Sequence, residues 1–152
     1  MYRLTRYFLL FFAIGLLTQC KSDTDTPGLV TPASQTELLV ANTWRVDRVT
    51  DTGGKAINTA QLGLETAALL FLDFQFTNAN IVRAIDRTTK QIRNAGDWTL
   101  TADNTAINVK VTGFNGVFKL VELTKNSLIL QQEGVQVNGV KQAANLVFVP
   151  SI

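Results

Sequence analysis

The chain has 152 residues, with 14 Lys and Arg, 12 Asp and Glu, no His and a single Cys. At 46% hydrophobic and 17% charged residues, it can bury a core, and its length suits one domain better than two. The absence of His removes the commonest metal ligand and the commonest general base. One Cys cannot form an internal disulfide or a thiolate metal cluster. The composition therefore predicts neither an enzyme nor a metal or other cofactor.

Residues 1–19 have the pattern of a signal peptide. Arg3 and Arg6 precede an apolar run from Tyr7 to Leu17, which is shorter than the roughly 20 residues of a bilayer span and suits a secretory signal. The following Leu17-Thr18-Gln19-Cys20 resembles a bacterial lipobox, except that Gln19 stands where a small residue is usual. This resemblance implies cleavage before Cys20 and lipid attachment to its sulfur. The alternatives are an uncleaved membrane anchor and a secreted protein that is cut elsewhere.

Residues 20–36 are rich in Ser, Thr, Asp and Pro, which predicts a flexible tether between the lipid and the domain. Lys21 to Asp25 resembles a short Lys/Ser/Asp signal that directs lipoproteins to the cell surface, and ordinary linker composition explains it equally well. We therefore expect a lipid-anchored protein of the outer membrane or cell envelope. Removal of Arg3 and Arg6 with the signal leaves twelve basic and twelve acidic residues, so the charge gives no support for a nucleic-acid partner.

Residues 37–152 alternate between apolar and polar positions, with turn residues between the runs, which indicates β-strands. Asn138-Gly139 predicts a tight hairpin turn, and Gly134 a bulge just before it. Gly113 to Gly116 interrupts the pattern, and Ala56 to Ala68 predicts one short helix or an irregular insertion. The expected strands are 42–50, 69–77, 81–88, 96–101, 106–112, 117–123, 127–133 with 135–137, and 140–150.

About eight short strands with hairpin-length connections predict an all-β fold. Each strand has one mostly apolar face, which it can bury only in a closed barrel or a sandwich. Short connections favour sequential antiparallel neighbours. We therefore predict an eight-stranded antiparallel up-and-down β-barrel rather than a Greek-key sandwich.

Five short motifs recur in the same order in a known group of domains: Asn42–Val46, Phe74–Thr77, Gly96–Leu100, Leu120–Thr124 and Ser127–Leu130. With them, the region from about residue 38 to 150 resembles the lipocalin-like domains of small Bacteroidetes-type lipoproteins. The first motif departs from the family by having Asn42-Thr43-Trp44 in place of Gly-x-Trp. The resemblance implies a lipocalin-like barrel and says almost nothing about function.

An eight-stranded barrel is just wide enough either to be filled by side chains or to hold one small ligand. The expected ligand is small and hydrophobic, and the candidate interior residues are Trp44, Phe74, Phe76, Trp98, Phe118 and Phe148. The alternative function is a structural or interaction module, in which a filled barrel displays its loops to an envelope protein partner.

No residue pattern predicts a catalytic site. Asp73 and Glu122 are acids at strand centres, and we expect both to face solvent. The basic residues between Arg83 and Arg93 are expected to form a solvated strand edge that discourages aggregation. The alternative for them is a site for an anionic sugar or a lipid headgroup.

Overall fold

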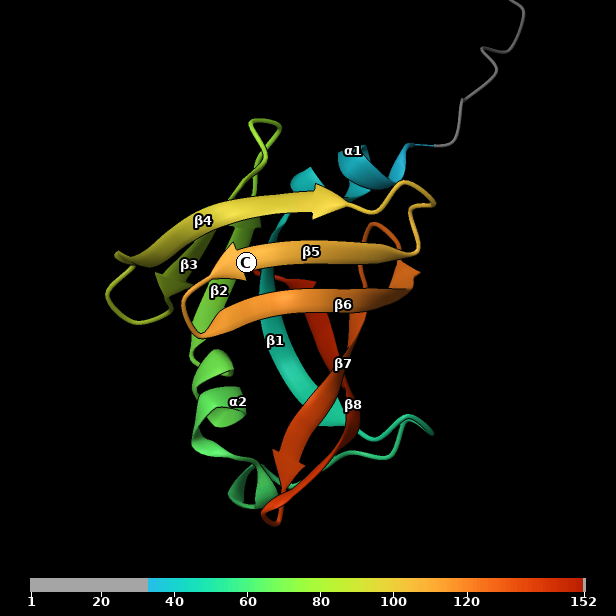
Figure 1. The fold of residues 1–152 in the computed structure, drawn as a ribbon. Helices are drawn as coiled ribbons and strands as arrows, with labels where there is room; N and C mark the ends of the chain where they lie inside the picture. Colours follow the sequence, from blue (N-terminus) through green and yellow to red (C-terminus); the bar gives the residue numbers. More distant parts are fainter. Residues whose placement is uncertain (1–32, 152) are drawn as a thin grey trace, which may run out of the picture. The chain divides into compact units, whose positions relative to one another are not determined.

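The computed structural model describes residues 33–151 (Figure 1). The predicted signal peptide, Cys20 and nearly all of the tether lie outside the described residues. The predicted eight-stranded antiparallel barrel is confirmed, since each strand pairs with the next and the last pairs with the first. The strands are β1 Thr43–Thr50, β2 Leu72–Phe76, β3 Ile81–Asp86, β4 Ile92–Leu100, β5 Ala106–Val111, β6 Phe114–Leu123, β7 Leu128–Val137 and β8 Val140–Pro150.

The alternation of buried and exposed side chains along β5 shows how the sequence builds the barrel. Ile107, Val109 and Val111 are at most 1% exposed, whereas Lys110 on the opposite face is exposed. Successive side chains of a strand point to opposite faces, so one face of the strand supplies the core and the other meets solvent.

Two local predictions in the β7–β8 hairpin are also confirmed. Asn138 and Gly139 both have positive φ, 52° and 78°, as a type I′ turn requires. The register of β7 against β8 shifts between Gln132 and Val135, and Gly134 within this bulge has φ 75°. A positive φ is strained for residues with a Cβ, so glycine suits this position.

Three strands begin three or four residues away from their predicted starts, and one of them is β4, which begins at Ile92 rather than Gly96. β2 begins at Leu72, because Leu69 belongs to the preceding helix. β6 begins at Phe114 rather than Val117, because the chain reverses within the two residues Thr112 and Gly113, and Gly113 has φ 82°. Gly116 is not part of the turn and pairs with Val109 of β5.

A short helix, α1 (Gln35–Val40), lies at one end of the barrel and was not predicted from the sequence. Ser34 begins it with a capping box, in which the Ser34 Oγ accepts from the Glu37 N–H and the Glu37 carboxylate accepts from the Ser34 N–H. The buried Trp44 donates its indole N–H to the Leu39 carbonyl at 2.8 Å. The predicted tether, which ended at residue 36, therefore overlaps the first turn of this helix.

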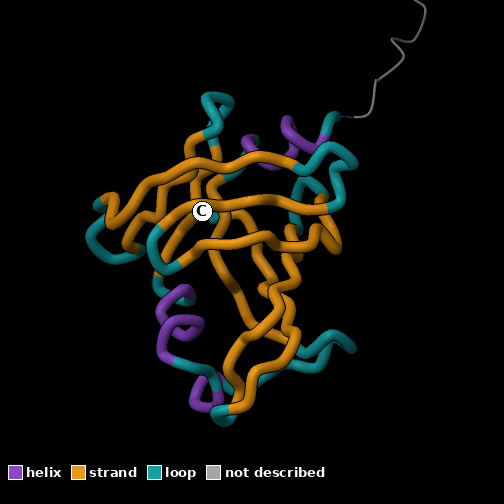
Figure 2. The backbone as a smooth tube through the Cα atoms, viewed as in Figure 1, coloured by secondary structure: helices purple, strands orange, loops and turns teal. Residues whose placement is uncertain are grey.

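The predicted insertion contains a 3₁₀ turn, η1 (Thr59–Gln61), and a second helix, α2 (Leu64–Leu69). Figures 1 and 2 show α2 at the end of the barrel opposite α1. Two backbone hydrogen bonds fix the insertion to the β7–β8 hairpin, from the Gly63 N–H to the Gln136 carbonyl at 2.9 Å and from the Asn138 N–H to the Gln61 carbonyl at 2.7 Å.

Residues Pro32–Ile152 form one compact unit. Its barrel is closed, so no strand is left without a neighbour on either side, and its hydrophobic cluster runs from Leu39 to Phe148. A chain that begins at Pro32 therefore contains its own core and closes its own sheet.

Candidate functional site

The six candidate interior side chains are all buried in the hydrophobic core, each at most 2% exposed. Phe74 contacts Phe148 edge-on with ring centroids 6.0 Å apart, and Phe76 contacts Trp98 in the same way at 5.6 Å. None of the six lines either of the two pockets described below. They fill the centre of the barrel rather than surround an open space there.

Phe114 is a core residue that the sequence reading missed. It is 2% exposed, and its ring centroid lies 4.6 Å from that of Phe74, 4.5 Å from Phe118 and 6.4 Å from Phe148. Because its neighbours Gly113 and Gly116 were both assigned to a turn, Phe114 was assigned to it as well. The spacing of two between Phe114, Gly116 and Phe118 was the signal that could have placed it on a strand.

The first pocket, which we call the apolar mouth pocket, lies between α2 and the barrel. Its volume is about 450 Å³, within the range of small-molecule sites. Its apolar lining includes Leu69, Leu72, Ala84 and Phe114, and Glu65 is the one ionisable residue in its lining. The full lining is Leu64, Glu65, Ala68, Leu69, Leu72, Ala84, Asn94, Thr112, Gly113 and Phe114.

The second pocket, the polar mouth pocket, lies between α2 and the β7–β8 hairpin and has a volume of about 540 Å³. Its lining includes Thr66, Gln132, Gln136 and Lys141. Both pockets are lined by Leu64 and Glu65, so they adjoin at the start of α2.

The strand register explains why the barrel opens at this end. β6 pairs with β7 only between Lys119 and Leu123, so its first residues, from Phe114, pair with β5 alone. The last residues of β7, to Val137, pair with β8 alone beyond the bulge. Figure 1 shows β6 and β7 diverging toward α2. The two pockets lie where these strands separate.

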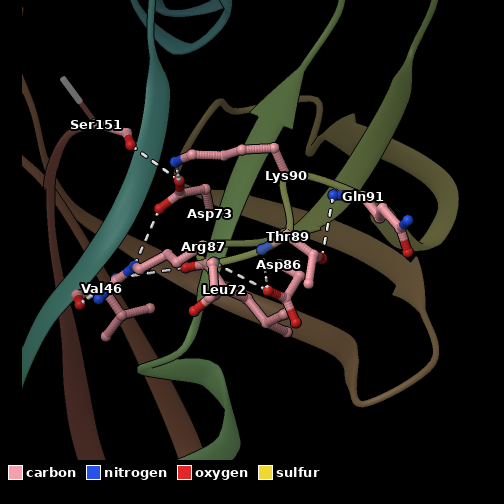
Figure 3. A network of polar contacts seen from close by, with 10 residues as sticks. Val46, Leu72, Asp73, Asp86, Arg87, Thr89, Lys90, Gln91 and Ser151 are labelled. Atoms are coloured by element: carbon pink, nitrogen blue, oxygen red, sulfur yellow. Dashed lines mark hydrogen bonds and ion pairs between the residues drawn. The ribbon is translucent and has the colours of Figure 1, made fainter.

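A polar network lies on the outer side of β2, centred on Asp73 (Figure 3). The Asp73 side chain is only 4% exposed, so the expectation that it faces solvent is wrong. Its carboxylate accepts from the Arg87 Nε at 3.1 Å and the Ser151 hydroxyl at 2.9 Å, and it forms an ion pair with Lys90 at 3.6 Å. Arg87 also donates to the carbonyl of Val46 at 2.8 Å, where the β1–β8 register shifts.

Arg93, at the end of the predicted basic cluster, is also paired, with Asp86 at 2.8 Å. The Thr89 backbone N–H and the Arg93 guanidinium hold the pKa of Asp86 well below its usual range. Three of the four basic residues of the cluster therefore form ion pairs with Asp73 or Asp86, and these contacts serve the fold. Glu122, by contrast, is exposed as expected.

Within residues 33–151, no three His, Cys, Asp or Glu side chains gather closely enough to hold a metal ion. No helix in the same range is long and apolar enough to cross a membrane.

Comparison with known proteins adds no relative. No protein-family model matches the chain, and no curated protein sequence matches it significantly.

Proposed function

We propose that this chain is a lipid-anchored lipoprotein of a bacterial envelope, whose lipocalin-like barrel binds a small hydrophobic ligand without catalysing a reaction. The observation that carries the proposal is the apolar mouth pocket, with its volume of about 450 Å³. The ligand would rest on Phe114, which joins this pocket to the aromatic core. Three of the six aromatic residues singled out in the sequence, Phe74, Phe118 and Phe148, contact Phe114 and would support the floor of the site.

The chemistry of the pocket supports binding rather than catalysis. Glu65 is the one ionisable group in its lining, so the pocket offers a single side chain that could transfer a proton. Leu69, Leu72 and Phe114 instead provide surface from which an apolar ligand displaces water. Asn94 and Thr112 give the lining a few polar groups, as sites for hydrophobic molecules usually have.

The proposed anchor rests on the sequence, since Cys20 lies outside the described residues. A single acyl chain holds a protein on a membrane only marginally, so the several chains of a processed lipoprotein would give a stable attachment. The segment from Lys21 to Ala33 would let the barrel stand at most roughly 45 Å from the lipid.

The anchor is tested by replacing Cys20 with Ala in the full chain, expressed in a bacterium with lipoprotein processing. We expect loss of metabolic labelling by an alkyne fatty acid and release of the protein from the membrane fraction. A Ser22→Ala chain, which alters the neighbouring tether, serves as the control. Unchanged labelling and fractionation of Cys20→Ala would refute the anchor.

Ligand binding is tested with the soluble chain that begins at Pro32, titrated with the neutral fluorophore N-phenyl-1-naphthylamine. Ala68 is exposed on α2 and lines the apolar pocket, so Ala68→Phe fills the pocket without entering the core. We expect this variant to weaken binding at least tenfold. Ala60→Phe, at an exposed position of η1 outside both pockets, is the matched control and retains the affinity.

Failure of the original chain to bind, or equal binding by the two variants, would refute the site. Organic extraction of protein purified from its native envelope, followed by mass spectrometry, then identifies the natural ligand.

A protein-interaction module is the second candidate function. It is favoured by apolar side chains that stay exposed around α2 and the β7–β8 hairpin. Leu64 is 87%, Phe71 69% and Val140 65% exposed, and such surface is typical of protein contacts when it is contiguous. This function predicts that Phe71→Glu abolishes cross-linking to one specific envelope protein in intact cells, while Ala68→Phe leaves that cross-link unchanged.

A further inference from the structure

We propose that the ligand is a single-chain amphiphile whose alkyl chain occupies the apolar mouth pocket and whose uncharged, hydrogen-bonding head group occupies the polar mouth pocket. This inference rests on the proposed function and names the class of molecule that the same end of the barrel takes. A monoacylglycerol is an example of this class.

The two pockets can hold one molecule because they meet at the first residues of α2. Leu64 and Glu65 line both of them, and Leu64 is 87% exposed although it is a large apolar residue. An exposed leucine at the junction would cover the bond between chain and head group. The divergence of β6 from β7 leaves both pockets accessible from the same end of the barrel.

The lining of the polar pocket favours an uncharged head group. Gln132 and Gln136 each offer an amide donor and an acceptor, and Thr66 offers a hydroxyl. Glu65 and Lys141 bring one charge of each sign to the same pocket, and neither forms an ion pair among residues 33–151. A head group with charge of only one sign would gain from one of them and be repelled by the other, whereas hydroxyl or amide groups can bond to all five.

Gln132 is the residue best placed to contact the head group. It lies opposite Ala144 in the β7–β8 register, and Ala144 is completely buried. Residues paired across two strands lie on the same face of the sheet, so Gln132 belongs to the inner face of the barrel. It is half-buried and lines the polar pocket, where an amide without the ligand would face water.

The volume of the apolar pocket limits the length of the chain. A methylene fills about as much space as a water molecule in the liquid, roughly 30 Å³, so the 450 Å³ pocket takes a chain of at most about fifteen carbons. Up to that length, each added methylene should tighten binding about fourfold. Longer chains should gain no further affinity, because the extra carbons stay in water.

The test titrates the soluble chain that begins at Pro32 with three ten-carbon probes by isothermal calorimetry, below their micellar concentrations. The probes are 1-monodecanoylglycerol, decanoate and decyltrimethylammonium. We expect the glycerol ester to bind at least tenfold more tightly than either ion. Gln132→Leu should remove this preference while N-phenyl-1-naphthylamine binds as before.

Gln131→Leu is the matched control, because Gln131 is also half-buried but lines neither pocket. Gln136→Leu, at an exposed position of the polar pocket, is a second variant that does not depend on the folding of Gln132→Leu.

The outcomes of these titrations distinguish failure of the amphiphile assignment from failure of the proposed function. Tightest binding by one of the ions, equal binding by all three probes, or no effect of either pocket variant would overturn the amphiphile assignment while leaving hydrophobic binding intact. Failure of all three probes and of N-phenyl-1-naphthylamine would instead overturn the proposed function itself.

Discussion

Replacing Phe114 with Ala tests whether the residue that links the pocket to the core is also a principal part of that core. Phe114 is 2% exposed and has three aromatic neighbours, two of them with ring centroids within 4.6 Å. Truncation of a buried phenylalanine costs about 3–5 kcal/mol. Phe114 also lines the open mouth pocket, which lets water and neighbouring side chains enter the space, so we expect a value near the lower limit, about 3 kcal/mol.

A domain of this size has a free energy of unfolding of roughly 6–18 kcal/mol, so the variant should stay folded. Urea unfolding of the soluble chain, followed by tryptophan fluorescence, should show a midpoint lowered by about 1.5–2 M with an unchanged slope. Val117→Ala is the control, because Val117 is on the same strand but 63% exposed, and it should change stability by less than about 0.5 kcal/mol. A cost below about 1 kcal/mol for Phe114→Ala would refute the role assigned to the ring.

Three further predictions concern the frame that supports the site. Gly96→Ala should cost about 3 kcal/mol in urea unfolding, because its Cβ would lie 1.9 Å from the Lys110 carbonyl oxygen; a neutral effect would contradict the close approach of β4 and β5. Arg87→Met should cost about 1–3 kcal/mol, since it removes a donor from the buried Asp73, and an equally stable variant would show that the network is dispensable. The lowered pKa of Asp86 means that its ionised form stabilises the fold above pH about 4, and that this contribution is lost as the pH falls. Urea midpoints should therefore drop less between pH 5 and pH 3 in Asp86→Asn than in the original chain, and parallel curves would contradict the assignment.

The strands were largely predictable because their signals are local. The alternation of Ile107, Val109 and Val111 with polar neighbours fixes which face of β5 is buried. The Asn138-Gly139 pair specifies its own turn, because both residues tolerate positive φ.

Two features were not predicted, and each depends on contacts that form only in the folded barrel. α1 has a local capping box at Ser34, but six residues do not make a stable helix alone, and the contact of Leu39 with Trp44 comes from the fold. The burial of Asp73 depends on Arg87 and Ser151, which lie far along the chain.

The amino-acid sequence by itself determined the fold class, the number of strands and six of the seven buried aromatic residues of the barrel, because burial of alternating apolar side chains is a property of each strand. Tertiary structure alone decided where the two mouth pockets lie. The pockets exist because β6 and β7 separate after a few paired residues and α2 lies across the opening. Such a space is defined by the distances between segments that are remote in the chain, and no local pattern of residues encodes those distances.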